Sequence, residues 1–167
     1  MPRWLIALQH FVPGTIVELQ TKPAYHDNRL VEGSRIFHRL FWTFKSCIDG
    51  FSFCKPVVQI DGTFLYGKYK GTLLLATAQD GNRNILPIAF AIVEGETKEA
   101  WSFFLTNLRR HVTLQHGICL ILDLHESIKA AIRRRGSGWQ PPEAYSVYCI
   151  HHICANFMKR FNNKDLR

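Results

Sequence analysis

The sequence predicts a mixed α/β fold in which an antiparallel meander leads into parallel strands. Three apolar, β-rich runs at Val57–Leu65, Gly71–Gln79 and Ile85–Val93 are separated by short turn-forming segments, and connections of that length join antiparallel neighbours. Later in the sequence, helical patterns alternate with short apolar runs, as in sheets whose parallel strands are connected by helices. With 167 residues and 47% hydrophobic content, the chain can bury a core.

The first 55 residues are predicted to precede this domain, which is placed at residues 56–167. A short strand is expected at Thr15–Leu19, and the polar stretch Pro23–Gly33 indicates a loop. Aromatic and aliphatic side chains then recur at helical spacing, so Arg35–Ile48 is predicted to be an amphipathic helix.

After the meander, the pattern predicts a helix with Thr97 as its N-cap and one buried stripe formed by Trp101, Phe104, Leu105, Leu108 and Val112. The continuous hydrophobic run Ile118–Leu122 is typical of an interior parallel strand. A short helix at Ser127–Arg134, a strand at Ala144–Cys149 and a last helix complete the order βββαβαβα.

The chain carries a formal net charge of +8, and the excess lies mostly in residues 101–167, which hold ten Lys and Arg against four Asp and Glu. Such a field favours an anionic partner, nucleic acid first, although a merely basic domain explains the charge as well. No apolar run approaches the ~18–20 residues that span a bilayer, so no membrane partner is expected. The five cysteines contain no CxxC pair and do not indicate a disulfide framework.

Two aspartates are candidates for a site. Asp61 interrupts the first apolar run, and Asp123 ends the run Ile118–Leu122, positions where a sheet holds side chains on a rigid frame. A buried carboxylate needs a metal ion or another cation nearby. The alternatives are a glycine-assisted bend at Asp61 and an N-terminal cap of the next helix at Asp123. Three other acids suit the dipole of a helix start, namely Glu94, Glu96 and Glu99.

Several basic residues are candidates for contacts with the phosphates of a DNA backbone. The alternative is that they lie in solvent at the ends of helices, where the helix dipole favours them. They are Lys68, Lys70, Arg133, Arg134, Arg135, Lys159 and Arg160. Cys149 and His152 form a single Cys-x-x-His pair, whereas zinc normally takes four ligands. A Zn²⁺ site there is therefore a weaker hypothesis than packing or a DNA contact.

The order and spacing of several segments carry a family resemblance. They include Gln59-Ile60-Asp61-Gly62-Thr63-Phe64, Gly67-Lys68-Tyr69-Lys70-Gly71, Val93-Glu94-Gly95-Glu96, Leu122-Asp123-Leu124-His125 and Tyr148-Cys149-Ile150-His151-His152. From about Val57 to its end, the chain resembles the catalytic domain of plant Mutator-like element transposases.

This resemblance implies an RNase H-like mixed sheet with helices on both faces. It implies a DDE-type site in which Asp61 and Asp123 are the first two catalytic acids and bind Mg²⁺ or Mn²⁺ for DNA cleavage and strand transfer. It also implies a nuclear protein whose partners are transposon ends and target DNA, with no small-molecule substrate; self-association is left open. Cys149 and His152 correspond to the family's Cys-x-x-His motif.

Two departures from the family pattern set further expectations. Leu124 stands before His125 where the family usually has Arg, which removes a phosphate or carboxylate contact. The family's third acid lies well beyond the Cys-x-x-His segment, so we expect a domain truncated at its C-terminus and a chain that does not cleave DNA by itself. The alternative is a domesticated relative that keeps the fold for DNA binding or transcriptional regulation without catalysis.

Overall fold

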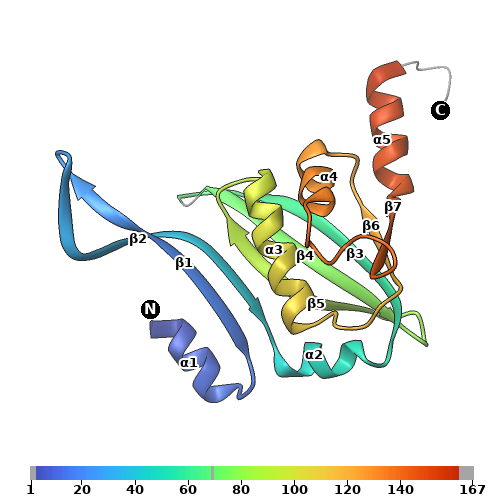
Figure 1. The fold of residues 1–167 in the computed structure, drawn as a ribbon, viewed down its shortest axis with the longest axis horizontal. Helices are drawn as coiled ribbons and strands as arrows, with labels where there is room; N and C mark the ends of the chain where they lie inside the picture. Colours follow the sequence, from blue (N-terminus) through green and yellow to red (C-terminus); the bar gives the residue numbers. More distant parts are fainter. Residues whose placement is uncertain (1–2, 69, 162–167) are drawn as a thin grey trace.

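The described residues form a seven-stranded mixed sheet with helices packed against it (Figure 1). The structure is a computed structural model and describes residues 3–68 and 70–161. The elements follow in the order α1 (Arg3–Phe11), β1 (Ile16–His26), β2 (Arg29–Thr43), α2 (Lys45–Phe51), β3 (Cys54–Leu65), β4 (Gly71–Asp80), β5 (Ile85–Val93), α3 (Lys98–His111), β6 (Ile118–Leu122), α4 (Glu126–Arg133), β7 (Ala144–Tyr148) and α5 (Ile150–Phe161).

The sheet confirms the predicted meander and the parallel strands that follow it. The strand order is β1-β2-β5-β4-β3-β6-β7, with β3, β4 and β5 antiparallel to one another. Strand β6 runs parallel to β3, and β7 runs parallel to β6 at the edge of the sheet. This mixed α/β arrangement is consistent with the expected RNase H-like fold.

The predicted helix at Arg35–Ile48 is wrong over most of its length, because Arg29–Thr43 forms β2 and only Lys45–Phe51 is helical in this region. Both Leu40 and Phe41 are buried, although neighbouring residues on a strand face opposite sides. A strand covered on both faces shows no alternation of apolar and polar residues, so its sequence was indistinguishable from a helical stripe.

The predicted loop at Pro23–Gly33 is also wrong. Strand β1 continues through His26 and β2 begins at Arg29, so only Asp27 and Asn28 form the turn. Both turn residues have positive φ, 45° and 61°, as a two-residue type I′ hairpin turn requires. Strand β2 then pairs with β5. Strands β1 and β2, which lie in the predicted N-terminal region, therefore belong to the same sheet as the strands of residues 56–167.

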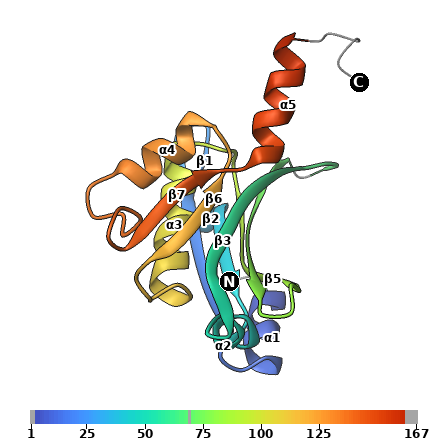
Figure 2. The same cartoon turned by 90° about the vertical axis from the view of Figure 1, so that its right-hand side faces the viewer.

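The main core lies between the sheet and α3. Thr97 caps this helix as predicted, its side chain accepting a hydrogen bond from the amide of Ala100. Trp101 and Phe104 are fully buried against the sheet. Figure 2 shows α3 and α4 together on one side of the sheet, whereas α1 lies by the other side at the β1 end. Helix α5 projects from the domain and has no buried residue.

None of the described helices combines the length and the hydrophobicity needed to cross a membrane.

Candidate functional site

Asp61 lies on an uninterrupted part of β3 and is half exposed, with 51% of its side chain accessible. Strand β3 pairs with β4 without a register shift from Val58 to Leu65, so the chain does not bend at Asp61. The amide of Gly62 donates a hydrogen bond to Oδ1 of Asp61 at 2.8 Å. The strand therefore presents a carboxylate in a fixed orientation, and the alternative of a bend is not supported.

Asp123 directly follows β6, the parallel neighbour of β3. The amide of Leu124 donates to its Oδ1 at 2.5 Å. The cap of α4 is His125, whose ring accepts from the amide of Ser127, so the alternative role of Asp123 as that cap is wrong. Asp61, four residues before the end of β3, and Asp123, directly after β6, thus come from adjacent parallel strands.

Glu96 lies near enough to these two aspartates for their charges to act on it, a proximity that the sequence did not predict. It lies between β5 and α3, where its carboxyl packs against Gly62: a Cβ on that glycine would come within 2.9 Å of Cδ of Glu96. Burial raises the pKa of Glu96 above its ordinary value, and the nearby charges of Asp123 and Asp61 raise it further. Three carboxylates therefore share one electrostatic environment.

Two histidines oppose this effect and complete the cluster. The charges of His125 and His152 act to lower the pKa of Glu96. His152, in the first turn of α5, places Nε2 3.9 Å from Oδ1 of Asp61. Its Nδ1 is buried and has no hydrogen-bond partner among the described residues. The second member of the Cys-x-x-His pair thus lies beside Asp61.

The donor chemistry of this cluster suits a hard divalent cation, because carboxylate oxygens are preferred ligands of Mg²⁺ and Mn²⁺. Among residues 3–68 and 70–161, however, no three His, Cys, Asp or Glu side chains are gathered closely enough to hold a metal ion. A cation at Asp61 and Asp123 would therefore need water or phosphate oxygens among its ligands. Cys149 and His152 as a Zn²⁺ site remain a prediction.

The basic residues that were predicted to contact DNA occupy three separate places. Lys68 and Lys70 lie at the β3–β4 connection, and Lys159 and Arg160 lie at the far end of α5 (Figure 1). The remaining three lie at or just after the end of α4: Arg133, Arg134 and Arg135. The structure thus distributes these charges and does not gather them into one patch.

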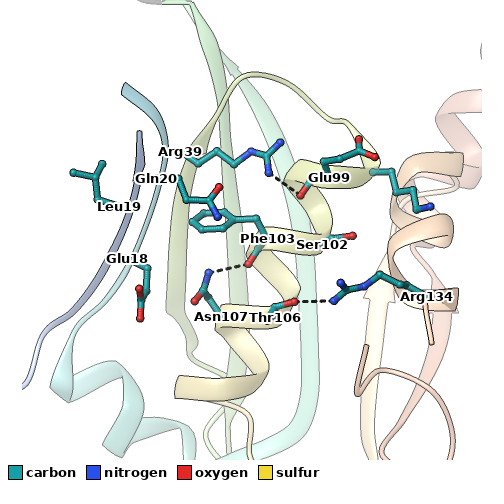
Figure 3. A pocket seen from close by; sticks show the side chains of 11 residues that line it. Glu18, Leu19, Gln20, Arg39, Glu99, Ser102, Phe103, Thr106, Asn107 and Arg134 are labelled. Atoms are coloured by element: carbon teal, nitrogen blue, oxygen red, sulfur yellow. Dashed lines mark hydrogen bonds between the residues drawn. The ribbon is translucent and has the colours of Figure 1, made fainter. Parts of the chain in front are cut away.

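A pocket lies between β1, β2 and α3, away from the carboxylates, and has a volume of about 560 Å³ (Figure 3). Its arginines are engaged by the protein itself. Arg134 donates to Oγ1 of Thr106 at 3.2 Å, and Arg39 donates to the carbonyl of Glu99 at 3.1 Å. Both arginines of this pocket are therefore held by hydrogen bonds within the protein, and Lys98 adds a third cation to its lining.

Arg39 also fixes the segment that carries Glu96. Its guanidinium binds both carboxylate oxygens of Glu94, through Nε at 2.8 Å and through Nη2. Glu94 directly follows β5, and Glu99 lies at the start of α3. Arg39 on β2 therefore forms hydrogen bonds to both ends of the segment that connects β5 to α3. The position of Glu96 thus depends on a strand far from it in sequence.

The Arg39–Glu94 pair makes stability depend on pH. The hydrogen bond from Arg39 lowers the pKa of Glu94 from 4.5 to about 2. Since the folded pKa lies below the unfolded one, the stabilisation is complete above about pH 4.5 and is lost as pH falls toward 2. Allowing for solvent screening, we expect it to reach about 1–2 kcal/mol.

Urea unfolding of the wild type and Glu94→Gln at several pH values measures this effect. The difference in free energy of unfolding between the two proteins is expected to shrink from pH 6 toward pH 3. A difference that stays constant across that range would contradict the pairing.

Comparison with known families places the cluster in context. A family model described as MULE transposase domain matches residues 57–156, from β3 into α5, which includes Asp61, Glu96, Asp123 and His152. No curated protein matches the chain.

Proposed function

We propose, because this chain belongs to the MULE transposase domain family, that Asp61 and Asp123 bind a divalent cation for cleavage and transfer of DNA phosphodiesters. The observation that carries the proposal is the placement of Asp61 and Asp123 on adjacent parallel strands, with Glu96 near enough to both for their charges to raise its pKa. The family is transposase-related and acts on DNA; the metal, its ligands and a nuclear location are parts of the proposal.

Each acid has a distinct role in this proposal. Asp61 and Asp123 are the metal ligands, since the amides of the following residues orient one oxygen of each. Glu96 adds a third carboxylate whose raised pKa suits it to accept a proton. A bound Mg²⁺ or Mn²⁺ would supply the activation of water or a 3′-hydroxyl and the stabilisation of the leaving oxygen.

DNA would be held by basic residues on segments that adjoin this cluster. Lys70 lies on the connection that follows β3, the strand of Asp61, and Lys159 and Arg160 lie at the far end of α5, the helix of His152. Contacts from these side chains to phosphates would position a strand without reading its sequence. We expect the resulting affinity to fall steeply with salt.

A non-catalytic DNA-binding role is the second candidate. It is favoured by one observation: among the described residues the acids are not gathered as a ready metal site. The two candidates differ in whether a cation joins the complex with DNA.

Binding of Mn²⁺, followed by electron paramagnetic resonance, distinguishes the candidates. We expect the 167-residue chain to bind Mn²⁺, and to bind it more tightly with a DNA duplex present, because phosphate oxygens complete the ligand set. Asp61→Asn or Asp123→Asn should weaken that binding by at least tenfold, a loss of about 1.4 kcal/mol or more.

The matched control is Asp27→Asn, since Asp27 is an exposed aspartate in the β1–β2 turn whose positive φ asparagine also adopts. This variant should bind Mn²⁺ like the wild type. If Asp61→Asn and Asp123→Asn also titrate like the wild type, the proposed metal site is wrong and the non-catalytic role is preferred.

A further inference from the structure

Strands β1 and β2 continue beyond the rest of the sheet as a two-stranded arm, residues 21–38. Strand β2 pairs with β5 only at Leu40, Phe41 and Trp42, so along the arm β1 and β2 have no third strand beside them among the described residues. Figure 1 shows the arm projecting away from the domain. None of its residues is buried, so the arm adds little to the core.

The arm exposes large apolar side chains as well as polar ones. The accessible fraction is 64% for Tyr25, 56% for Leu30 and 55% for Ile36. A two-stranded hairpin without other support is at best marginally stable in water. An arm of this kind that also presents apolar side chains to solvent therefore indicates a surface that binds a partner.

Cations lie on both strands of the arm. Lys22 is on β1 and Arg29 is on β2, both are exposed, and neither has an ion-pair partner among residues 3–68 and 70–161. Arg35, by contrast, donates a hydrogen bond to the carbonyl of Thr21 across the arm. Residues 21–38 hold three Lys and Arg against two Asp and Glu, so the placement of the free cations matters more than the net charge.

The arm leaves the sheet at the same end as the acid cluster. Asp61 pairs with Leu75, Leu75 with Phe90, and Phe90 with Trp42, so Asp61 and Trp42 lie in one row across four strands. Each of these three pairings is antiparallel, so β2 runs antiparallel to β3. The residues before Trp42, which lead into the arm, therefore lie toward the end of the sheet where β3 finishes.

The separation of the arm from the acids matches a short length of DNA. Ile36, the partner of Lys22, lies six residues before Trp42. From the rise per residue and the spacing of the strands, Ile36 is about 25 Å from Asp61. That distance corresponds to about seven base pairs of B-DNA. One duplex can therefore contact both the arm and the acids.

We propose that the arm lies in the major groove of a DNA duplex, with Lys22 and Arg29 contacting phosphates on its two walls. A major groove about 12 Å wide admits a two-stranded ribbon, whereas a minor groove about 6 Å wide does not. Phosphate contacts fix the register of a duplex, so the arm positions the strand whose phosphodiester lies at the acids. The inference rests on the proposed function in taking DNA as the partner, but it needs no metal.

Fluorescence anisotropy of the 167-residue chain with a labelled duplex of about 20 base pairs, long enough to reach the arm and the acids together, tests this proposal. The measurement is made in EDTA over a range of salt concentrations. Lys22→Gln/Arg29→Gln should weaken duplex binding by about tenfold or more and reduce the salt slope by about two, one for each lost phosphate contact. Binding of the single strand of the same sequence should fall less, because a single strand has no groove.

The matched control is Lys55→Gln/Arg110→Gln, which also removes one lysine and one arginine. Lys55 lies near the start of β3 and Arg110 in the last turn of α3, both exposed and away from the acid end of the sheet. This variant should bind the duplex within about twofold of the wild type. Urea unfolding should give the same midpoint for both double variants, because all four side chains are exposed.

Three results would overturn the inference: equal losses of duplex affinity in the two double variants, equal losses on duplex and single strand, and an arm variant that changes only self-association in sedimentation. The last result would make the arm an interface between copies of the chain. The metal proposal fails separately. Absent Mn²⁺ binding with arm-dependent duplex affinity rejects the metal site alone, and intact Mn²⁺ binding with equal losses in the two double variants rejects the arm alone.

Discussion

Replacing Arg39 by methionine is expected to lower the free energy of unfolding by about 2–3 kcal/mol, below the usual 3–5 kcal/mol for breaking a buried ion pair because Glu94 is partly exposed. Arg39 is 9% exposed, and its guanidinium serves the Glu94 carboxylate and the Glu99 carbonyl together. Methionine fills the space of the aliphatic part but leaves both acceptors without their donor.

Urea unfolding measures this loss, with Arg35→Met as the matched control. Arg35 lies on the same strand, is exposed, and hydrogen-bonds to Thr21 across the hairpin. Its replacement should cost less than about 0.5 kcal/mol. The Arg39→Met/Glu94→Gln double variant should recover part of the loss, because it no longer leaves a charge unpaired. A cost for Arg39→Met equal to that of Arg35→Met would refute the role given to Arg39.

Trp139→Ala is expected to destabilise the domain by about 3–5 kcal/mol, the usual cost of emptying a large buried site. Trp139 lies between α4 and β7 and is 1% exposed. Its indole Nε1 donates to the carbonyl of Leu105 on α3 at 3.0 Å, and the guanidinium of Arg109 lies 5.7 Å from the centre of its ring. Trp139 thus holds the connection between α4 and β7 against α3 through a hydrogen bond and a cation–π contact.

A comparison of two conservative variants isolates the hydrogen bond. Trp101 is equally buried, but its Nε1 has no partner among the described residues. Trp139→Phe loses a hydrogen bond as well as volume, whereas Trp101→Phe loses volume and removes an unsatisfied donor. The expected order of cost is Trp139→Ala, then Trp139→Phe, then Trp101→Phe. A larger cost for Trp101→Phe than for Trp139→Phe would show that packing alone decides.

The parts of the fold that the sequence predicted well are those with one buried face or a clear local signal. The helix after Thr97 and the three-stranded meander were both predicted correctly, because the apolar residues of each recur with a regular period and turn or capping residues mark its ends. Strand β2 was missed because it is covered on both faces around Leu40 and Phe41, which hides the strand period. Its partner β5 lies about fifty residues away, and no local pattern records that pairing.

The candidate site divides in the same way. Asp61 and Asp123 were distinguishable because each lies in or directly after an apolar run. Glu96 was assigned to the helix dipole with its neighbours, and its packing on Gly62 arises from tertiary contacts between β3 and the connection after β5. The signal that was available is the Val93-Glu94-Gly95-Glu96 segment, which already belonged to the resemblance.

The position of β7 has a consequence for how the protein behaves in solution. In the part of the chain that the structure describes, this strand lies at the edge of the sheet, and it consists of Ala144, Tyr145, Ser146, Val147 and Tyr148. It carries neither charge nor proline, the features with which natural sheets protect a free edge from strand addition by another chain. We therefore expect association that increases with protein concentration, and a lysine at Val147, which is 44% exposed, to suppress it.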